Sequence, residues 1–412
     1  MVASEHNLEL PTVAPGRWRT LTLLSAAELL GMSLWFSASA VVPALRVEWQ
    51  LTDTQTSWLT ISVQLGFVLG TLLSAFFNLA DIFRPRILLA VCAFAGALTN
   101  TLLALTAHDA TSALIFRFIT GMFLAGVYPP AMKLMSTWFR QSRGLALGVL
   151  VGALTLGKAS PYLINAVGSA DWRSNIIAVS LLATIGGILV LLFVSEGPYA
   201  LPRATFDWTQ VVKIFRNRGV RLANFGYFGH MWELYAMWTW VPLMLRASFS
   251  QQGASPKFAE VGSFIVIGSG AIGCAVAGLI ADRVGRTVVT SWAMAISGTC
   301  CLIVGFLFGA SPIVLLSVAA IWGATVVADS AQFSSCVTEL GDQQYIGTAL
   351  TIQMCIGFLL TTISIQIIPP LVNAIGWRYA FMVLAPGPLF GVLAMLRLRS
   401  LPESIKIAHG RR

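Results

Sequence analysis

The stretch GYFGHMWELYAMWTWVP, residues 226–242, decides the fold class of this chain. It lies within the apolar run 222–245, which is long enough to cross a bilayer as a helix, because a crossing takes about 20 residues. His230 and Glu233 lie near the middle of this run, three positions apart and therefore on one helical face. Each charge at membrane depth costs about 2.5–3.5 kcal/mol on insertion scales, so ionisable residues there indicate a functional site. The stretch predicts a membrane protein that moves a solute.

The composition of the whole chain agrees with this interpretation. Of its 412 residues, 57% are hydrophobic and only 10% are charged, and the mean hydropathy is +0.79. A soluble domain carries about 25% charged residues. The apolar runs are continuous and helix-length, unlike the alternating strands of an outer-membrane barrel. We therefore expect an all-α, polytopic membrane protein.

Twelve apolar segments of helix length follow one another, at residues 19–45, 57–80, 87–107, 111–138, 144–167, 174–194, 221–245, 260–281, 287–308, 312–338, 346–372 and 379–396. The net charge of +9 comes from arginines and lysines that gather in alternate loops, such as 84–86, 140–143 and 283–286. By the positive-inside rule those loops are cytoplasmic, which explains the charge without any binding of nucleic acid. We expect a multi-pass protein of the bacterial inner membrane with both termini in the cytoplasm.

The two halves of the chain form an internal repeat. Four short matches recur at offsets of 201, 199, 205 and 202 residues: Ala80-Asp81 with Ala281-Asp282, Val42-Pro43 with Val241-Pro242, Trp172-Arg173 with Trp377-Arg378, and Gly121 with Gly323. Both halves begin on the same membrane side, so the repeat is parallel, with a cavity between two six-helix bundles. The expected organisation is a cytoplasmic tail (1–16), an N-terminal bundle (17–194), a linker with an interfacial helix (195–220), a C-terminal bundle (221–397) and a second cytoplasmic tail (398–412).

Two motifs point to a family. The sequence GLIADRVGR, residues 278–286, resembles the loop motif G-x-x-x-D-R-x-G-R of the major facilitator superfamily, and Arg117-Phe-Ile-Thr-Gly121 is similar to its second motif, R-x-x-x-G. The first-half counterpart of the loop motif, residues 78–86, keeps Asp81 and two arginines but lacks the glycines. With twelve spans and a parallel repeat, the resemblance covers nearly the whole chain. It implies a secondary transporter that works by rocker-switch alternating access.

The loop motif also has a physical role that can be predicted. An aspartate at a helix end can cap the next helix and pair with arginine, which would lock the two bundles together on the cytoplasmic side. The alternative is that the arginines only set the topology. We expect gating residues at Asp81, Arg84, Gly278, Asp282, Arg283 and Arg286.

Lys158 is the first candidate for substrate binding. It lies in the fifth span, where Gly144, Gly148 and Gly152 form a ridge of small residues on which another helix can pack closely. At 100° per residue Lys158 lies about 90° from that ridge, so it can face the cavity while the glycines pack. A lysine at this depth can bind an anionic substrate or neutralise a carboxylate within the membrane.

Other polar and aromatic residues lie in the spans that, by the resemblance, supply much of the cavity lining. The expected substrate-binding residues are Lys158, Trp35, Tyr128, His230 and Glu233, and the expected proton-coupling residues are Glu28, Glu233, Asp329 and Arg117. Burial favours the neutral form of a carboxylate, as a proton carrier requires. The alternative for each is a structural hydrogen bond, and Arg117 is equally well explained as a counter-ion for one of these carboxylates.

The substrate is predicted only as a class. A small anion bound by Lys158 is the first hypothesis, with distant resemblance to nitrate/nitrite and oxalate/formate porters. However, the arginines that those families carry in the second and eighth spans are missing here. The alternative is proton-coupled export of drug-like, amphipathic or cationic compounds, although the fifth span has Gly157-Lys158 and an isolated Pro161 in place of the G-P-x-x-G-G motif of drug antiporters. A channel would not explain the repeat together with the gating motif.

No catalytic function is expected. The chain has no phosphate-binding loop, no H-E-x-x-H pair and no G-x-S-x-G elbow, so transport must use a gradient. The six cysteines fall within apolar spans and do not form a metal-binding set with histidines. We expect no enzyme activity, no cofactor and no metal; the partners are a small solute, protons and the lipid bilayer, and the protein is expected to be a monomer.

Overall fold

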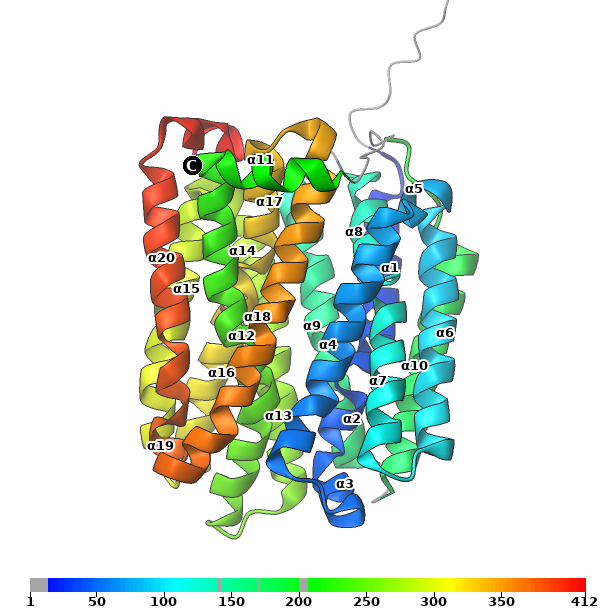
Figure 1. Ribbon diagram of the computed structural model, residues 1–412, viewed down its shortest axis with the longest axis vertical. Coiled ribbons are helices and arrows are strands. Elements are labelled where there is room, and N and C mark those ends of the chain that lie inside the picture. Colours follow the sequence, from blue (N-terminus) through cyan, green and yellow to red (C-terminus); the bar gives the residue numbers. More distant parts are fainter. Residues whose placement is uncertain (1–13, 140–141, 169–170, 200–206) are drawn as a thin grey trace, which may run out of the picture.

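The computed structural model describes residues 14–139, 142–168, 171–199 and 207–412, and it is an all-α bundle of roughly parallel and antiparallel long helices (Figure 1). Within these residues, eleven helical segments of 22 to 30 residues are long and apolar enough to cross a membrane. The helix α12, Arg218–Ser250, contains the stretch that decides the fold and is longer still, with 33 residues. It falls short of the other eleven only in apolar composition, because it carries residues such as His230 and Glu233. The protein is a multi-pass membrane protein.

The helices of the first half are α1 (Arg17–Met32), η1 (Ser33–Phe36), α2 (Ser37–Ala40), α3 (Val42–Trp49), α4 (Asp53–Phe76), α5 (Leu79–Ile82), α6 (Pro85–Thr106), α7 (Ala110–Leu124), α8 (Tyr128–Ser136), α9 (Arg143–Val167) and α10 (Trp172–Phe193). Those that follow are η2 (Trp208–Gln210), α11 (Val211–Arg216), α12 (Arg218–Ser250), α13 (Pro256–Gly268), α14 (Gly270–Val284), α15 (Arg286–Ile303), η3 (Val304–Leu307), α16 (Pro312–Ala328), α17 (Ser330–Leu340), η4 (Gln343–Tyr345), α18 (Ile346–Ile375), α19 (Trp377–Ala380), η5 (Phe381–Leu384), α20 (Pro386–Arg399) and η6 (Pro402–Gly410). We call residues 14–199 the first half and residues 207–412 the second half.

Six spans that the hydrophobic pattern predicts as single helices are divided in the structure, so the prediction of unbroken helices was wrong there. The breaks separate α1 from α2, α7 from α8, α13 from α14, and α16 from α17, and the 3-10 segments η3 and η5 interrupt the spans 287–308 and 379–396. Two of the breaks have a local cause that the sequence or a hydrogen bond shows. Pro129 and Pro130 stand at the start of α8 and have no N–H to continue the helix. At the next break the Ser269 hydroxyl donates both to the Val266 carbonyl in its own chain segment and to the Ala320 carbonyl of α16.

The repeat has a structural counterpart in two glycines. A methyl group on Gly121 of α7 would come within 2.0 Å of the Val63 carbonyl oxygen in α4. A methyl group on Gly323 of α16 would come within 1.8 Å of the Val266 carbonyl oxygen in α13. In both halves the fourth span therefore lies backbone to backbone on the second span of the same half, a contact that only glycine permits.

The two halves meet at two contacts between membrane spans. The helix α9 packs along α13 and α14, and α18 packs along α4. In the second contact the buried Thr361 hydroxyl donates to the Gln64 side-chain carbonyl at 2.6 Å. In the first contact the glycine ridge of α9 packs as predicted, because a methyl group on Gly148 would lie 2.7 Å from the Cys274 carbonyl oxygen of α14.

The bundle has two ends, which we name for the argument below. The terminal face carries α5, α11, α17 and the C-terminal η6, and the opposite face carries α3 and α19 (Figure 1). The short helix α11 lies across the terminal face, at a steep angle to the long helices (Figure 1). The expected N-terminal tail falls largely in residues 1–13, and part of the expected linker falls in residues 200–206; both ranges lie outside the described residues.

Candidate functional site

Lys158 lies in the core, where the two halves face each other. The glycine ridge of its helix, α9, packs against α14, and this orientation turns Lys158 away from α14 toward η1 and α12. The residue is only 3% exposed. Within the described residues no carboxylate lies within ion-pair distance of it, and the Glu28 carboxyl group on α1 is within electrostatic range. Burying a lysine ammonium without a counter-ion is costly, so the charged form depends on other groups around it.

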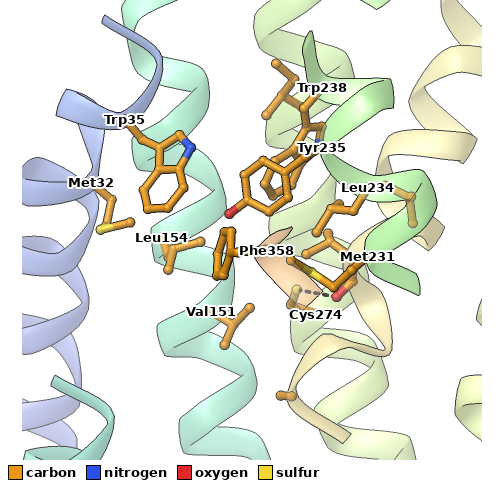
Figure 2. Close-up of a cluster of buried hydrophobic side chains, with 14 of the residues drawn as sticks. Met32, Trp35, Val151, Leu154, Met231, Leu234, Tyr235, Trp238, Cys274 and Phe358 are labelled. Carbon is orange, nitrogen blue, oxygen red and sulfur yellow. Dashed lines mark hydrogen bonds between the residues drawn. The ribbon is translucent and has the colours of Figure 1, made fainter. Parts of the chain in front are cut away.

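Aromatic rings from both halves surround the ammonium. The Nζ atom lies 4.1 Å from the ring centroid of Trp35, 4.7 Å from that of Tyr235 and 5.2 Å from that of Trp238, all within the range of cation–π attraction. Lys158 also donates a hydrogen bond to the Tyr235 hydroxyl. Figure 2 shows Tyr235 and Trp238 projecting from α12 toward Trp35, with Phe358 of α18 closing the cluster. We call Lys158, Trp35, Tyr235 and Trp238 the lysine cage.

The lysine cage contains unused hydrogen-bond donors. The indole N–H groups of Trp35 and Trp238 are buried and have no acceptor among the described residues. Buried donors normally find a partner, and one left without costs about 1–3 kcal/mol. Figure 2 shows the Trp35 nitrogen on the side of its ring that faces Tyr235. One cation and two free N–H donors together make a set that suits an anion.

Arg117 is bound to main-chain carbonyls and not to a carboxylate, so the described contacts do not support the alternative of a counter-ion. Its guanidinium donates to the carbonyls of Leu34 (2.9 Å), Trp35 and Leu59 (3.3 Å), and to the Ser37 hydroxyl (3.1 Å). The first two carbonyls belong to η1, where the first span departs from a regular helix. A fully buried Arg117 therefore stabilises the irregular turn that presents Trp35 to Lys158.

Glu28 is a buried carboxyl group without a donor. It lies on α1, is 0% exposed, and neither of its oxygens has a hydrogen-bond partner in the described structure. Tyr128, at the start of α8, is half-buried and within electrostatic range of it. A carboxyl group buried without a donor is stable only as the neutral acid, because the cost of burying an isolated charge is far larger.

His230 and Glu233 of α12 both contact other helices of the second half. His230 Nδ1 lies 2.8 Å from the Asp329 carboxylate, at the break between α16 and α17. The Glu233 carboxylate accepts hydrogen bonds from the Ser297 hydroxyl (2.9 Å), the Cys301 thiol (2.9 Å) and the Trp322 indole (2.5 Å). The structure brings together His230 and Asp329, which were predicted in different roles, and it gives Glu233 three donors from α15 and α16.

The structure does not bring Glu233 to the lysine cage. On a helix of 100° per residue, Glu233 and Tyr235 lie about 160° apart, on nearly opposite sides of α12. The side that carries Tyr235 and Trp238 meets Lys158, and the side that carries Glu233 meets α15 and α16. The predicted residues therefore fall into two separate groups.

On the terminal face, the loop motif joins the halves. A methyl group on Gly144, at the start of α9, would lie 2.8 and 2.9 Å from the two Asp282 carboxylate oxygens. Arg286 pairs with Asp282 at 3.4 Å and with Glu339 of α17 at 2.8 Å, and donates to Gln332 at 2.7 Å. Gly278 packs on Gly144, whose carbonyl oxygen would lie 2.8 Å from an added methyl group. These contacts place a second-half carboxylate against the start of a first-half helix.

The first-half copy of the motif is arranged differently. Asp81 pairs at 2.6 Å with Lys133 of α8, which also donates to the Ala80 carbonyl at 2.7 Å. The side chains of Arg84 and Arg283 are exposed, and neither has a hydrogen-bond or ion-pair partner among the residues that the structure describes. Among the predicted gating residues, Asp282, Gly278 and Arg286 thus form one cluster, and Asp81 forms another.

A cavity opens on the opposite face, between the halves. It has a volume of about 550 Å³ and is lined by Arg46 and Asp53 of the first half and by Trp240, Arg246 and Asn373 of the second, among others. Below it lies a cavity of about 20 Å³, lined by Thr60, Tyr162, Thr239, Arg246 and Glu260, among others. The larger one, which we call the outer cavity, is in the size range of sites for small organic ligands, about 300–1,000 Å³.

Several of these residues were missed by the sequence analysis. Tyr235 and Trp238 lie in the quoted stretch, but nothing in the sequence says that they face Lys158, which is 77 positions away from Tyr235. Lys133, Arg246 and Glu260 lie in or beside predicted spans, and their charge at that place was a usable signal.

Comparisons with known proteins agree with this architecture. Residues 23–365 match the family model of the Major Facilitator Superfamily. A puromycin resistance protein, pur8, from Streptomyces alboniger is 30% identical over 42% of this chain and 35% of its own length. An agnestins efflux protein from Paecilomyces divaricatus is 26% identical over 78% of this chain and 74% of its own. A probable nitrate/nitrite antiporter, NarK1, from Thermus thermophilus is 28% identical over 41% of this chain and 38% of its own.

Proposed function

The chain belongs to the major facilitator superfamily of membrane transporters, and we propose that it carries a small organic anion by alternating access, with Lys158 as the charge that binds it. The terminal face is cytoplasmic in this proposal, in a bacterial inner membrane, because it carries the basic loops. The structure then has its cavity on the outer side and its gating contacts closed on the inner side.

One observation carries the proposal. Among the residues that the structure describes, no carboxylate pairs with the buried Lys158 of the lysine cage, and two indole N–H groups beside it lack an acceptor. A bound anion would supply both the missing charge and the missing acceptors. The cage is built from both halves, so an anion in it would contact each half and would be exposed to either side as the halves rock.

The walls of the cage favour an anion with an apolar or aromatic body. Trp35 packs against Phe67 and Phe358 with ring centroids 5.1 and 5.6 Å apart, and Tyr235 packs against Phe358 at 5.2 Å. Rings in such a site can stack on a planar substrate. Small inorganic anions would leave this aromatic surface unused, so we favour aromatic carboxylates over nitrate.

Glu28 is the proton carrier that the geometry supports best. As a neutral acid it leaves Lys158 free to bind the substrate anion. After the anion leaves, loss of the Glu28 proton would supply a carboxylate that compensates the lysine charge. Anion and proton would then bind and leave together, which gives symport. Glu233 is a weaker candidate for this role because three donors already hold it.

A second candidate is export of an amphipathic compound without negative charge. Two relatives are named for resistance or efflux, and the aromatic rings of the cage would suit such a compound. A cation would be repelled by Lys158, which counts against the cationic version.

Uptake into proteoliposomes tests the proposal. A panel of radiolabelled carboxylates, including benzoate and pyruvate, is compared with nitrate and with a cationic dye under an inward proton gradient. We expect Lys158→Ala to abolish both the uptake and the binding of carboxylates. Lys133→Ala, measured by the same binding titration, should still bind the same carboxylate. Uptake of an uncharged amphipathic dye by both the wild type and Lys158→Ala into vesicles with an acidic interior, without any carboxylate uptake, would support the exporter instead.

A further inference from the structure

A line of polar residues connects the outer cavity with the lysine cage. On α9, Tyr162 follows Lys158 by four positions, and on α12, Thr239 follows Tyr235 by four and Arg246 follows it by eleven. At these spacings each set lies along one side of its helix. The two sides face each other, because Lys158 bonds to Tyr235 at one end and Tyr162, Thr239 and Arg246 line the same small cavity at the other.

Arg246 lines both the outer cavity and the small cavity beneath it. Its side chain is 37% exposed and is paired at 3.3 Å with Glu260, whose side chain is only 9% exposed. On α12 it stands about 16 Å beyond Tyr235, at a rise of 1.5 Å per residue. The guanidinium is thus reached from the outer side, and its carboxylate partner is buried below it.

We infer that Arg246 is an outer binding station for the transported anion, and that Glu260 occupies this station when no anion is present. This inference rests on the proposed function, because it names a second site on the path of the same substrate. An anion that enters the outer cavity displaces the Glu260 carboxylate from the guanidinium, and then moves past Tyr162 and Thr239 to Lys158. The internal carboxylate makes the station selective, because only a ligand that pairs with arginine better than Glu260 does can take its place.

Arg46 provides a matched control. It lines the outer cavity too, and its side chain is 36% exposed, almost the same as that of Arg246. However, it pairs with Asp53 near the rim and does not line the small cavity. Asp53 is also held by the Asn373 amide of the second half at 3.2 Å. The inference therefore assigns different behaviour to two arginines of equal exposure in one cavity.

Protection from phenylglyoxal, a reagent for guanidinium groups, tests the inference in the purified full-length protein. Modification of each arginine is followed by mass spectrometry with increasing benzoate, and in parallel with nitrate. We expect benzoate to slow the modification of Arg246 but not that of Arg46. We also expect Glu260→Gln to speed the modification without ligand and to lower the half-protecting benzoate concentration about fivefold, as the loss of a competing ion pair of about 1 kcal/mol would do.

A variant in the cage separates this inference from the proposed function. In Lys158→Ala the outer station should still be protected by benzoate, even though transport is lost. Equal protection of Arg46 and Arg246, no protection of Arg246 by either anion, or an unchanged half-protecting concentration in Glu260→Gln would each overturn the outer station. None of these results would affect a finding that Lys158 binds the transported anion.

Discussion

Lys158 of the first half donates a hydrogen bond to the Tyr235 hydroxyl of the second half, and this contact lies at the centre of an aromatic cage. A bond between the halves at this depth couples the charge of the cage to their relative position. The ammonium has three N–H donors, so it can bind an anion while the tyrosine hydroxyl holds it in position. The contact thus offers a direct link between substrate binding and the rocking of the halves.

Tyr235→Phe should weaken anion binding without unfolding the protein. The ring would remain in the cage, but the ammonium would lose the acceptor that fixes its position. Hydrogen bonds to charged groups contribute about 1.5–3 kcal/mol, so we expect at least about a tenfold rise in the dissociation constant. Isothermal titration with the transported carboxylate measures this. Tyr227→Phe, on the same helix but packed against His230 and Phe333, is the control and should bind normally.

Arg117→Lys should destabilise the protein and leave its pH response intact. A lysine cannot reproduce the set of hydrogen bonds to the Leu34, Trp35 and Leu59 carbonyls. Leaving such buried groups unpaired costs about 1–3 kcal/mol for each group. We expect a lower melting temperature in detergent. Transport whose pH profile flattens in this variant, with the melting temperature unchanged, would show that Arg117 belongs to the proton path.

Glu28→Gln and Glu233→Gln form a matched pair of variants. The first should retain carboxylate binding but lose the dependence of that binding on pH, because glutamine mimics the neutral acid and cannot release a proton. The second should keep the pH dependence and lose about 1–3 kcal/mol of stability, because an amide satisfies the Ser297, Cys301 and Trp322 donors less well. Binding titrations at several pH values and thermal unfolding measure both effects. The opposite pattern would transfer the proton role to Glu233.

Gly144→Ala should open the terminal face. The added methyl group would meet the Asp282 carboxylate oxygens at 2.8 and 2.9 Å, so the start of α9 and the end of α14 would have to separate. Cys274 is buried at the same helix contact, beneath Gly148. We expect a water-soluble maleimide to label Cys274 faster in Gly144→Ala than in the wild type, with Cys336 as an internal reference. Equal labelling rates would mean that the Asp282 contact does not hold this face closed.

Glu48 should contribute to stability in a defined pH range. Hydrogen bonds from Arg173 and Trp172 hold the pKa of this carboxyl group, at the opposite face, below its usual value of 4.5. A group with a lowered folded-state pKa stabilises the protein above its unfolded pKa, and the contribution disappears as the pH falls through the folded pKa. The melting temperatures of wild type and Glu48→Gln should therefore differ by a constant amount above about pH 5.5 and converge in stronger acid. A difference that grows with acidity would contradict this assignment.

The fold followed from the sequence because membrane helices have a strong local signal. Hydropathy, loop charge and the residues of the loop motif predicted the class, and the matched family model confirms the family. The breaks at Ser33, Ser269 and Asp329 could not be predicted, because the groups that bond there come from other helices: the Arg117 guanidinium, the Ala320 carbonyl and the His230 ring. For Ser33 and its neighbours the decisive partner is Arg117, more than 80 positions away.

The site was predictable only in part for the same reason. Lys158 stood out because a lysine in mid-span is expensive, and helical geometry gave its correct orientation relative to the glycine ridge. Its partners Tyr235 and Trp238 come from the other half, and the sequence carries no information on how the halves face each other. The spacing of His230 and Glu233 predicted that they share one face of a helix. It did not reveal that both side chains turn toward other helices of the second half.

The central claim, that Lys158 binds the transported anion, is tested most directly by thermal stabilisation of the purified protein. Wild type, Lys158→Ala and Lys133→Ala are each melted with a panel of carboxylates, inorganic anions, cations and amphipathic drugs. A ligand at 100 times its dissociation constant adds about 2.7 kcal/mol to the stability, which is readily detected. We predict that a carboxylate stabilises the wild type and Lys133→Ala but not Lys158→Ala. Stabilisation of all three proteins by the same ligand, or of the wild type only by cations or uncharged drugs, would contradict the claim.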